Sequence, residues 1–125
     1  MANRKNGKTS PDRVAAMNRK SPPDRPRYDL IPVEVLEGVA RVFGHGAAKY
    51  EDNDWQRGIN TSNHYRAVMG HMADWRMGKE TDAESGYHHL DHALARLIML
   101  RYQTIYPEYT KFDDVRARIT AGDVE

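Results

Sequence analysis

The chain has 125 residues, a formal net charge of +1 and charged residues at 30% of its positions. That length is typical of one domain with a modest core, and the absence of cysteine excludes disulfide scaffolds, thiolate metal sites and cysteine nucleophiles. No signal peptide is recognisable and no apolar run reaches the roughly 18 residues of a membrane span, so we expect a soluble, cytoplasmic protein without a membrane partner.

Residues 1–26 predict a flexible basic arm. Eight lysines and arginines in residues 1–27 stand against Asp12 and Asp24, a balance of +6, so the remaining residues carry −5. Three prolines in SPPDRPR disfavour both helix and strand, although Ser10 is a good cap for a short helical piece before them. A solvated terminus without a partner explains this composition at least as well as contact with the phosphates of a nucleic acid.

A helical domain is predicted over residues 27–125. Its first helix is marked by apolar residues at the spacing i, i+3, i+4, i+7: Leu36, Val39, Ala40 and Phe43. Asp29 is the predicted cap, and Gly44 and Gly46 are expected to weaken or end this helix. The polar loop EDNDWQRGIN follows and carries one large aromatic residue, Trp55.

The second helix is expected to begin at Thr61 or Ser62, both good caps, and to end at Gly78. One stripe on it is apolar and is predicted to face the core: Tyr65, Val68, Met69, Met72 and Trp75. The adjoining stripe is largely polar and flanks that core face: His64, Ala67, His71 and Asp74.

A third helix is predicted after a charged turn, with Ser85 as its cap and Pro107 as its stop. Residues 97–100 are apolar nearly all round, which predicts burial by a bundle or by a second subunit. Residues 112–119 predict a short last helix. Because no stretch alternates apolar and polar residues as a strand does, we predict an all-α fold, a small helical bundle completed by oligomerisation.

The candidate metal site lies in residues 64–92, which hold five of the six histidines. Two motifs, His71-x-x-Asp74 and His88-x-x-Asp91, each place a nitrogen and an oxygen on one helix face. Antiparallel packing of the two helices would bring both pairs to one point, which suits a divalent metal. In HHLDH the last histidine can pair with either of the first two, on different faces. The candidate ligands are His71, Asp74, His88, His89, Asp91 and His92.

The alternative explanation for these residues is a hydrogen-bonded polar helix interface with a few surface histidines. In the turn between the helices, Asp82 and Glu84 are candidate catalytic groups, either as metal ligands or as bases that activate water. A solvated turn is the competing interpretation for both carboxylates. Upstream, cations that contact phosphates and an aromatic side chain that stacks on a base would together form a nucleotide pocket. The candidate substrate-binding residues are Lys49, Tyr50, Asn53, Trp55, Arg57 and Arg66.

The chain resembles the phage and prophage family of dATP/dGTP diphosphohydrolase N-terminal domains. Two runs carry the resemblance, RYDLIPVEVLEGVARVFGHGAAKYEDNDWQRG and GHMADWRMGKETDAESGYHHLDHALARLIML, which cover about Arg27 to Tyr102. The recurrent pieces are Asp29-Leu30-Ile31-Pro32, Gly46-Ala47-x-Lys49-Tyr50, Asn53-x-Trp55, Gly58, His71, Asp82-x-Glu84-Ser85-Gly86 and His89-Leu90-x-His92-Ala93. Several unusual pieces in the same order make the resemblance specific for the family.

The resemblance implies a relationship to the all-α MazG-like nucleoside triphosphate pyrophosphohydrolases. In those enzymes, E-x-x-E and E-x-x-D on successive helices bind the Mg²⁺ that holds the triphosphate. The two histidine motifs have equivalent spacing here, but histidine replaces the first glutamate of each, and imidazole suits Mn, Fe, Co, Ni or Zn better than Mg. The departure keeps open the chemistry of HD-type phosphohydrolases, although the chain has no adjacent His-Asp dipeptide.

The function implied by the resemblance is a pyrophosphohydrolase, dependent on Mg, Mn or Co, that converts dATP or dGTP to the monophosphate and pyrophosphate. Two alternatives stay open, a nucleotide-sequestering protein without hydrolysis and a helical protein that binds nucleic acid or a partner through its basic arm. MazG-like relatives are usually dimers or tetramers, so we expect a homo-oligomer, in the host cytoplasm if the gene is carried by a phage.

Overall fold

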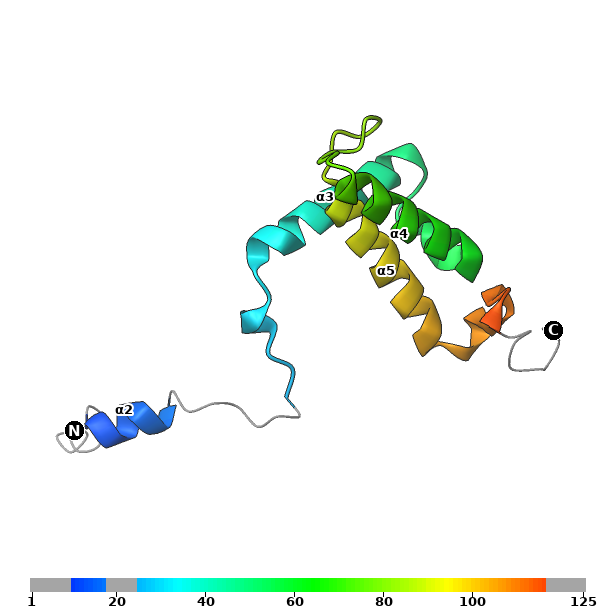
Figure 1. The fold of residues 1–125 in the computed structure, drawn as a ribbon. Helices are drawn as coiled ribbons and strands as arrows, with labels where there is room; N and C mark the ends of the chain where they lie inside the picture. The colour runs from blue at the N-terminus through cyan, green and yellow to red at the C-terminus, as the bar shows by residue number, and fades with distance from the viewer. Residues whose placement is uncertain (1–9, 18–24, 117–125) are drawn as a thin grey trace. The chain divides into compact units, whose positions relative to one another are not determined.

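The computed structural model describes residues 10–17 and 25–116 (Figure 1). The rest of the predicted basic arm, and the end of the helix predicted over residues 112–119, lie outside the described residues. Contacts along the chain divide it into two units, Met1–Ile31 and Pro32–Glu125.

The first unit contains a short helix, α2 (Pro11–Met17), and a 3-10 turn, η2 (Tyr28–Leu30). Ser10 caps α2 as expected, because its hydroxyl accepts a hydrogen bond of 3.1 Å from the amide of Arg13. In η2, Asp29 does not cap a long helix. Its carboxylate instead pairs with the guanidinium of Arg27 at 2.7 Å.

The second unit is helical: α3 (Val33–Lys49), η3 (Asp54–Arg57), α4 (Thr61–Arg76), α5 (His89–Ile105) and η4 (Pro107–Phe112). Across residues 10–17 and 25–116 the only β-type pairing is one isolated bridge between Thr81 and His88. The all-α prediction is therefore confirmed. None of the described helices is long and apolar enough to cross a membrane.

Helix α3 runs further than the sequence predicts. It begins after Pro32 and continues through Gly44 and Gly46 to Lys49, where the amide of Tyr50 closes the last turn on the carbonyl of Gly46 at 2.9 Å. Each glycine costs a helix about 1 kcal/mol relative to alanine, and burial of an apolar face offsets this cost. In α3 that face is Val39 and Val42, which are buried with Ala95 of α5.

Helices α4 and α5 form an antiparallel hairpin. Hydrogen bonds join His71 to His89, His64 to Arg96, and the backbone of Ile59 to Gln103. Residue numbers therefore decrease along α4 as they increase along α5. The two helices lie side by side in Figure 1, with the connecting loop at the end where α5 begins. The predicted antiparallel packing across this loop is therefore present.

The prediction that the apolar stripe of α4 faces the core is wrong for the separate chain. The polar stripe faces α5, with His64 fully buried, whereas the apolar stripe is exposed except at the half-buried Val68. Exposed fractions on the apolar stripe are 64% for Tyr65, 49% for Met69, 39% for Met72 and 40% for Trp75. Hydrogen bonds with α5 engage one ring nitrogen each of His64 and His71, whereas Nε2 of His64 is buried without a partner in the described part of the chain.

The start of α5 also differs from the expectation. Ser85 does not cap it, because the loop turns back on itself through Gly86 (φ 78°) and a hydrogen bond of 2.8 Å from the amide of Asp82 to the carbonyl of Tyr87. His88 is the cap instead, with its Nδ1 accepting from the amide of Leu90 at 3.0 Å. Helix α4 likewise begins at Thr61, as predicted, but its cap residue is Asn60. Asn60 makes no side-chain capping bond.

An aromatic cluster closes the far end of the hairpin. Trp55 of η3 meets Phe43 and Tyr102, with ring centroids 5.9 and 5.0 Å apart. The cluster continues through Tyr106, Tyr109 and Phe112. Gly58, at φ 110°, lies directly under the ring of Phe112, where a β-carbon would overlap it. The aromatic residues thus anchor η3 and η4 on the last turns of α5.

Candidate functional site

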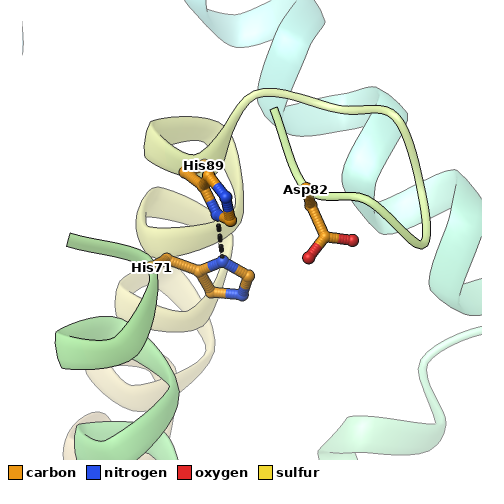
Figure 2. Close-up of side chains that lie close together, drawn as sticks. All are labelled: His71, Asp82 and His89. Carbon is orange, nitrogen blue, oxygen red and sulfur yellow. Dashed lines mark hydrogen bonds between the residues drawn. The ribbon is translucent and has the colours of Figure 1, made fainter. Parts of the chain in front are cut away.

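Three potential metal ligands converge where α4, α5 and their connecting loop meet (Figure 2). His71 projects from α4, His89 is the first residue of α5, and Asp82 reaches in from the loop. One ligand atom from each lies within 4.8 Å of the others. The two imidazoles face each other with their Nδ1 atoms 2.9 Å apart.

The local fold explains why these side chains meet. His89 is held at the start of α5 because its amide donates to the carbonyl of Glu80 at 2.9 Å. This bond keeps the two ends of the loop close together. Asp82 is fixed by the amide and hydroxyl of Ser85, at 2.9 and 3.0 Å from its Oδ2. The loop thus presents a carboxylate to the two helical histidines.

His92 and Asp74 surround this group. The ring of His92 stacks on that of His71 with centroids 4.6 Å apart, and its Nε2 lies 2.7 Å from the hydroxyl of Ser85 and 4.0 Å from Asp82. On the other side, a carboxylate oxygen of Asp74 lies 3.8 Å from Nε2 of His89. At 3.8 and 4.0 Å these carboxylates are too far away for a hydrogen bond and act on the imidazoles through their charge.

The protonation states at this site suit metal binding. Burial lowers the pKa of His71, and the two neighbouring histidines lower it further. Burial is also the main cause of the lowered pKa of His92, against the opposing charge of Asp82. For Asp82, burial works against ionisation, but the hydrogen bonds from Ser85 outweigh it and its pKa lies below the usual range. Neutral imidazoles beside an ionised carboxylate are the forms that bind a metal.

The distance between the two histidines fits a shared metal. With metal–nitrogen bonds of about 2.1 Å, two nitrogens at a right angle on one ion stand about 3.0 Å apart, and at the tetrahedral angle about 3.4 Å. The 2.9 Å between Nδ1 of His71 and Nδ1 of His89 is a hydrogen bond between the two rings, and it is also short enough for both nitrogens to bind one ion. Two imidazoles and one carboxylate form a donor set used for Mn, Fe, Co, Ni and Zn.

His88 and Asp91 do not join this group, contrary to the convergence predicted for the two motifs. Both nitrogens of His88 are engaged, Nδ1 with the amide of Leu90 and Nε2 with Glu80 at 2.9 Å. Asp91 lies against the backbone of α3, where its carboxylate occupies the space of a β-carbon on Gly38. The physical reason is the late start of α5, which makes His88 a cap rather than a helical residue.

The carboxylate of Glu84 lies outside the histidine group. It forms an ion pair of 3.2 Å with Lys49, and both residues line an open depression with His45 and Ala48. The ring of His45 packs edge-on against Tyr87 with centroids 5.8 Å apart, and His45 lowers the pKa of His92. The depression is therefore next to the histidine group, and Lys49 is the predicted phosphate contact that lies beside it.

The other predicted substrate contacts are dispersed. Tyr50 is exposed beside the ammonium of Lys49, 5.7 Å from its ring centroid. Asn53 has a left-handed backbone and pairs with Gln56 in η3. Trp55 belongs to the aromatic cluster around Tyr102, 13 residues and about 20 Å along α5 from His89.

The last two predicted substrate contacts are arginines. Arg57 pairs with carboxylates of its own loop, Asp54 at 2.9 Å and Glu51 at 3.7 Å. Arg66 is exposed on α4, close enough to Arg96 for its charge to lower the pKa of that residue. The structure therefore does not gather the six predicted substrate contacts into one pocket.

Sequence reasoning missed His45, Ser85 and Arg96. The signal for Arg96 was present, because His89, His92 and Arg96 stand at i, i+3 and i+7 on one face of α5. Ser85 was taken for a cap, so its contact with His92 was not foreseen. His45 gave no local signal, because its position depends on how α3 crosses α5.

Comparison with known proteins adds to this geometry. A family model described as dATP/dGTP diphosphohydrolase, N-terminal, matches residues 15–114. A dATP/dGTP diphosphohydrolase of Salmonella phage PMBT28 is 34% identical over 71 residues, which are 57% of this chain. The match spans 24% of the length of the phage protein. No solved structure matches the chain.

Proposed function

The chain belongs to the family of dATP/dGTP diphosphohydrolase N-terminal domains, and from this premise we propose that it takes part in hydrolysing a purine deoxynucleoside triphosphate to the monophosphate and pyrophosphate. The name of the Salmonella phage relative supports the nucleotide substrate. The observation that carries a metal-dependent reaction is the pair of Nδ1 atoms 2.9 Å apart in His71 and His89, with Asp82 within reach of the same point.

We propose His71, Asp82 and His89 as the ligands of a divalent metal. Two imidazoles favour Mn, Co, Fe or Zn over Mg in this donor set. When bound, the metal would supply charge neutralisation at the phosphates and activation of water. Ser85 would hold Asp82 through a hydrogen bond, and the charge of Asp74, 3.8 Å from Nε2 of His89, would offset part of the positive charge of the metal.

His92 is the proposed proton acceptor. Its ring stacks on His71 and its Nε2 is hydrogen-bonded to Ser85, so the imidazole is fixed beside the proposed ligands without belonging to them. In the reaction, the oxygen of water forms a bond to the α-phosphorus, the bond to the bridging oxygen of the β-phosphate breaks, and pyrophosphate leaves. His92 would take the proton that the water loses.

Lys49 is the proposed phosphate contact in the adjoining depression. Its ammonium is held by Glu84 at 3.2 Å, and this exposed pair can open to admit an anion at little cost. Tyr50, next in sequence and exposed, is a better candidate than Trp55 for stacking on the base, because Trp55 is packed against Phe43 and Tyr102.

We also propose that the chain self-associates through its apolar surface. Tyr65, Met69, Met72 and Trp75 form an exposed stripe along α4. Leu94, Leu97 and Ile98 are exposed on α5. Exposed apolar stripes on two neighbouring helices are typical of surfaces that a second subunit covers.

The experiment is chromatographic product analysis of each common dNTP and NTP after incubation with Mg²⁺, Mn²⁺ or Co²⁺. We expect monophosphate and pyrophosphate from one purine class, and their loss on adding a chelator or on replacing His89→Ala. The matched control is His88→Asn, which changes the neighbouring histidine and keeps an acceptor for the cap of α5. Nucleotides recovered intact with every metal would refute hydrolysis by this chain, and calorimetric titration would then test for nucleotide sequestration.

A further inference from the structure

A half-buried arginine without an acidic partner lies on α5, one turn beyond His92. The Nε of Arg96 donates to Nδ1 of His64 at 3.0 Å, and its Nη2 donates to the side-chain oxygen of Asn63. No carboxylate of the described chain forms an ion pair with Arg96 or with its neighbour Arg66. A guanidinium has five N–H donors, so three of those of Arg96 remain without a partner in the described chain.

The partners of Arg96 orient it without neutralising it. His64 is fully buried, and burial, followed by the charge of Arg96, lowers its pKa to about 4. His64 is therefore a neutral imidazole at physiological pH and accepts a hydrogen bond through Nδ1. Asn63 contributes an amide oxygen, which is also uncharged. The positive charge of Arg96 thus keeps its full strength while the side chain is held in place.

A second cation adds to this charge, because Arg66 stands three residues after Asn63 on the same side of α4, and Asn63 is bonded to Arg96. Burial lowers the pKa of Arg96, and the neighbouring charge of Arg66 lowers it further. Holding two like charges together, with one half-buried, is unfavourable for the free protein. A bound anion removes this penalty, and a phosphate group matches the planar donor array of a guanidinium through two parallel hydrogen bonds.

The position of Arg96 relates it to the histidine group. His89, His92 and Arg96 share the face of α5 that packs on α4, and the last two are four positions apart, about 6 Å along the axis. We propose that Arg96 and Arg66 form an anion site that binds phosphate groups of the nucleotide, with His64 and Asn63 as positioning residues. The nucleotide as ligand rests on the proposed function, whereas the anion site itself rests on the arginine pair.

The test uses inorganic tripolyphosphate, titrated calorimetrically into the full chain in the presence of EDTA, so that neither metal nor turnover contributes. We expect the dissociation constant to increase at least tenfold in Arg66→Ala and in Arg96→Gln. The matched control is Arg101→Ala, an exposed arginine on the same helix whose side chain bonds only to Thr104 among the described residues, and here the change should stay within twofold. Because Arg66 is exposed and makes no hydrogen bond in the described chain, its replacement does not endanger folding. Thermal melts check Arg96→Gln.

Three results would overturn the proposal. They are an absence of measurable binding by the unsubstituted chain, equal weakening in all three variants, and unchanged binding in Arg66→Ala. The outcome is separable from the proposed hydrolysis. If tripolyphosphate binding depends on both arginines but the chain leaves every nucleotide intact, the proposed hydrolysis is refuted and the anion site is supported. Hydrolysis with unaltered tripolyphosphate binding in the arginine variants removes only the anion site.

Discussion

The two faces of α4 differ in a way that reverses the usual relation between polarity and burial. Toward α5 the helix presents His64 and His71, whose hydrogen bonds join α4 to Arg96 and His89. Toward the outside it presents large apolar side chains such as Tyr65, which is 64% exposed. Burying polar groups costs free energy unless each is paired, and exposing apolar groups forfeits their transfer free energy. In α4 the polar face is therefore the one that contacts α5, and the apolar face is left exposed.

The largest expected effect comes from breaking the polar face at a proposed ligand. His71→Ala should lower the turnover of the preferred dNTP by roughly 10³-fold or more, about 4 kcal/mol on the barrier, because the proposed metal site would lose one of its two imidazoles. Steady-state kinetics with Mn²⁺ measure this. Turnover that stays within tenfold of the unsubstituted chain would contradict the assignment of His71, provided that circular dichroism shows an intact helical fold.

The second-largest effect is expected from acid, which should destabilise the folded chain through the polar face of α4. The pKa of His64 is about 4 in the folded chain and near 6.5 when unfolded, so the unfolded chain binds the proton first. His64 therefore does not lower the free energy of unfolding above about pH 6.5. As the pH drops from there toward 4, protonation of the unfolded chain lowers this free energy by up to about 3 kcal/mol. Urea denaturation at pH 7 and pH 4.5 should show a smaller loss in His64→Gln. An equal loss in both proteins would mean that His64 does not carry the effect.

A bound metal should stabilise the folded chain through the same polar face of α4. Free Mn²⁺ or Co²⁺ at 100 times its dissociation constant should stabilise the folded chain by about 2.7 kcal/mol, because the unfolded chain holds no site. The rise in melting temperature should disappear in His89→Ala and persist in His88→Asn. If both variants kept the rise, the ion would bind elsewhere on the chain.

The smallest effect on the folding of one chain is expected on the apolar face. Met69→Glu should change the free energy of unfolding of the separate chain by no more than about 0.5 kcal/mol, since Met69 is 49% exposed. It should nevertheless reduce the mass measured by light scattering, because a buried, unpaired carboxylate opposes association. A substituted chain that retains the mass of the unsubstituted one would place the subunit contact on another surface.

Local patterns predicted the existence of the helices but not their orientation. The spacing of apolar residues in α3 and the caps near Ser10 and Thr61 depend on neighbouring residues, and the corresponding elements are present. Which stripe of α4 faces α5 depends on the partner helix, and the polarity rule gave the wrong answer. Likewise, Gly44 and Gly46 weaken a helix in isolation, but burial of neighbouring valines maintains α3.

The candidate site was predictable in composition and only partly in geometry. The histidine-rich stretch and the role of Asp82 as a possible ligand follow from residue type and from the loop between two helices. The split between His89 and His88 could not be foreseen, because it depends on where α5 begins. That boundary is set by the hairpin of the loop, in which the amide of His89 bonds to Glu80. One residue of register decided which histidine entered the group.

The contact between Gly38 and Asp91 gives α3 a mechanical property. Because the carboxylate of Asp91 rests on bare backbone at Gly38, this contact acts as a fulcrum at which α3 crosses α5. His45 and Lys49 stand seven and eleven residues further along α3, about 10 and 16 Å from this contact. A β-carbon at position 38 would overlap the Asp91 carboxylate, so a larger residue there would push α3 away from α5 and carry the depression with it.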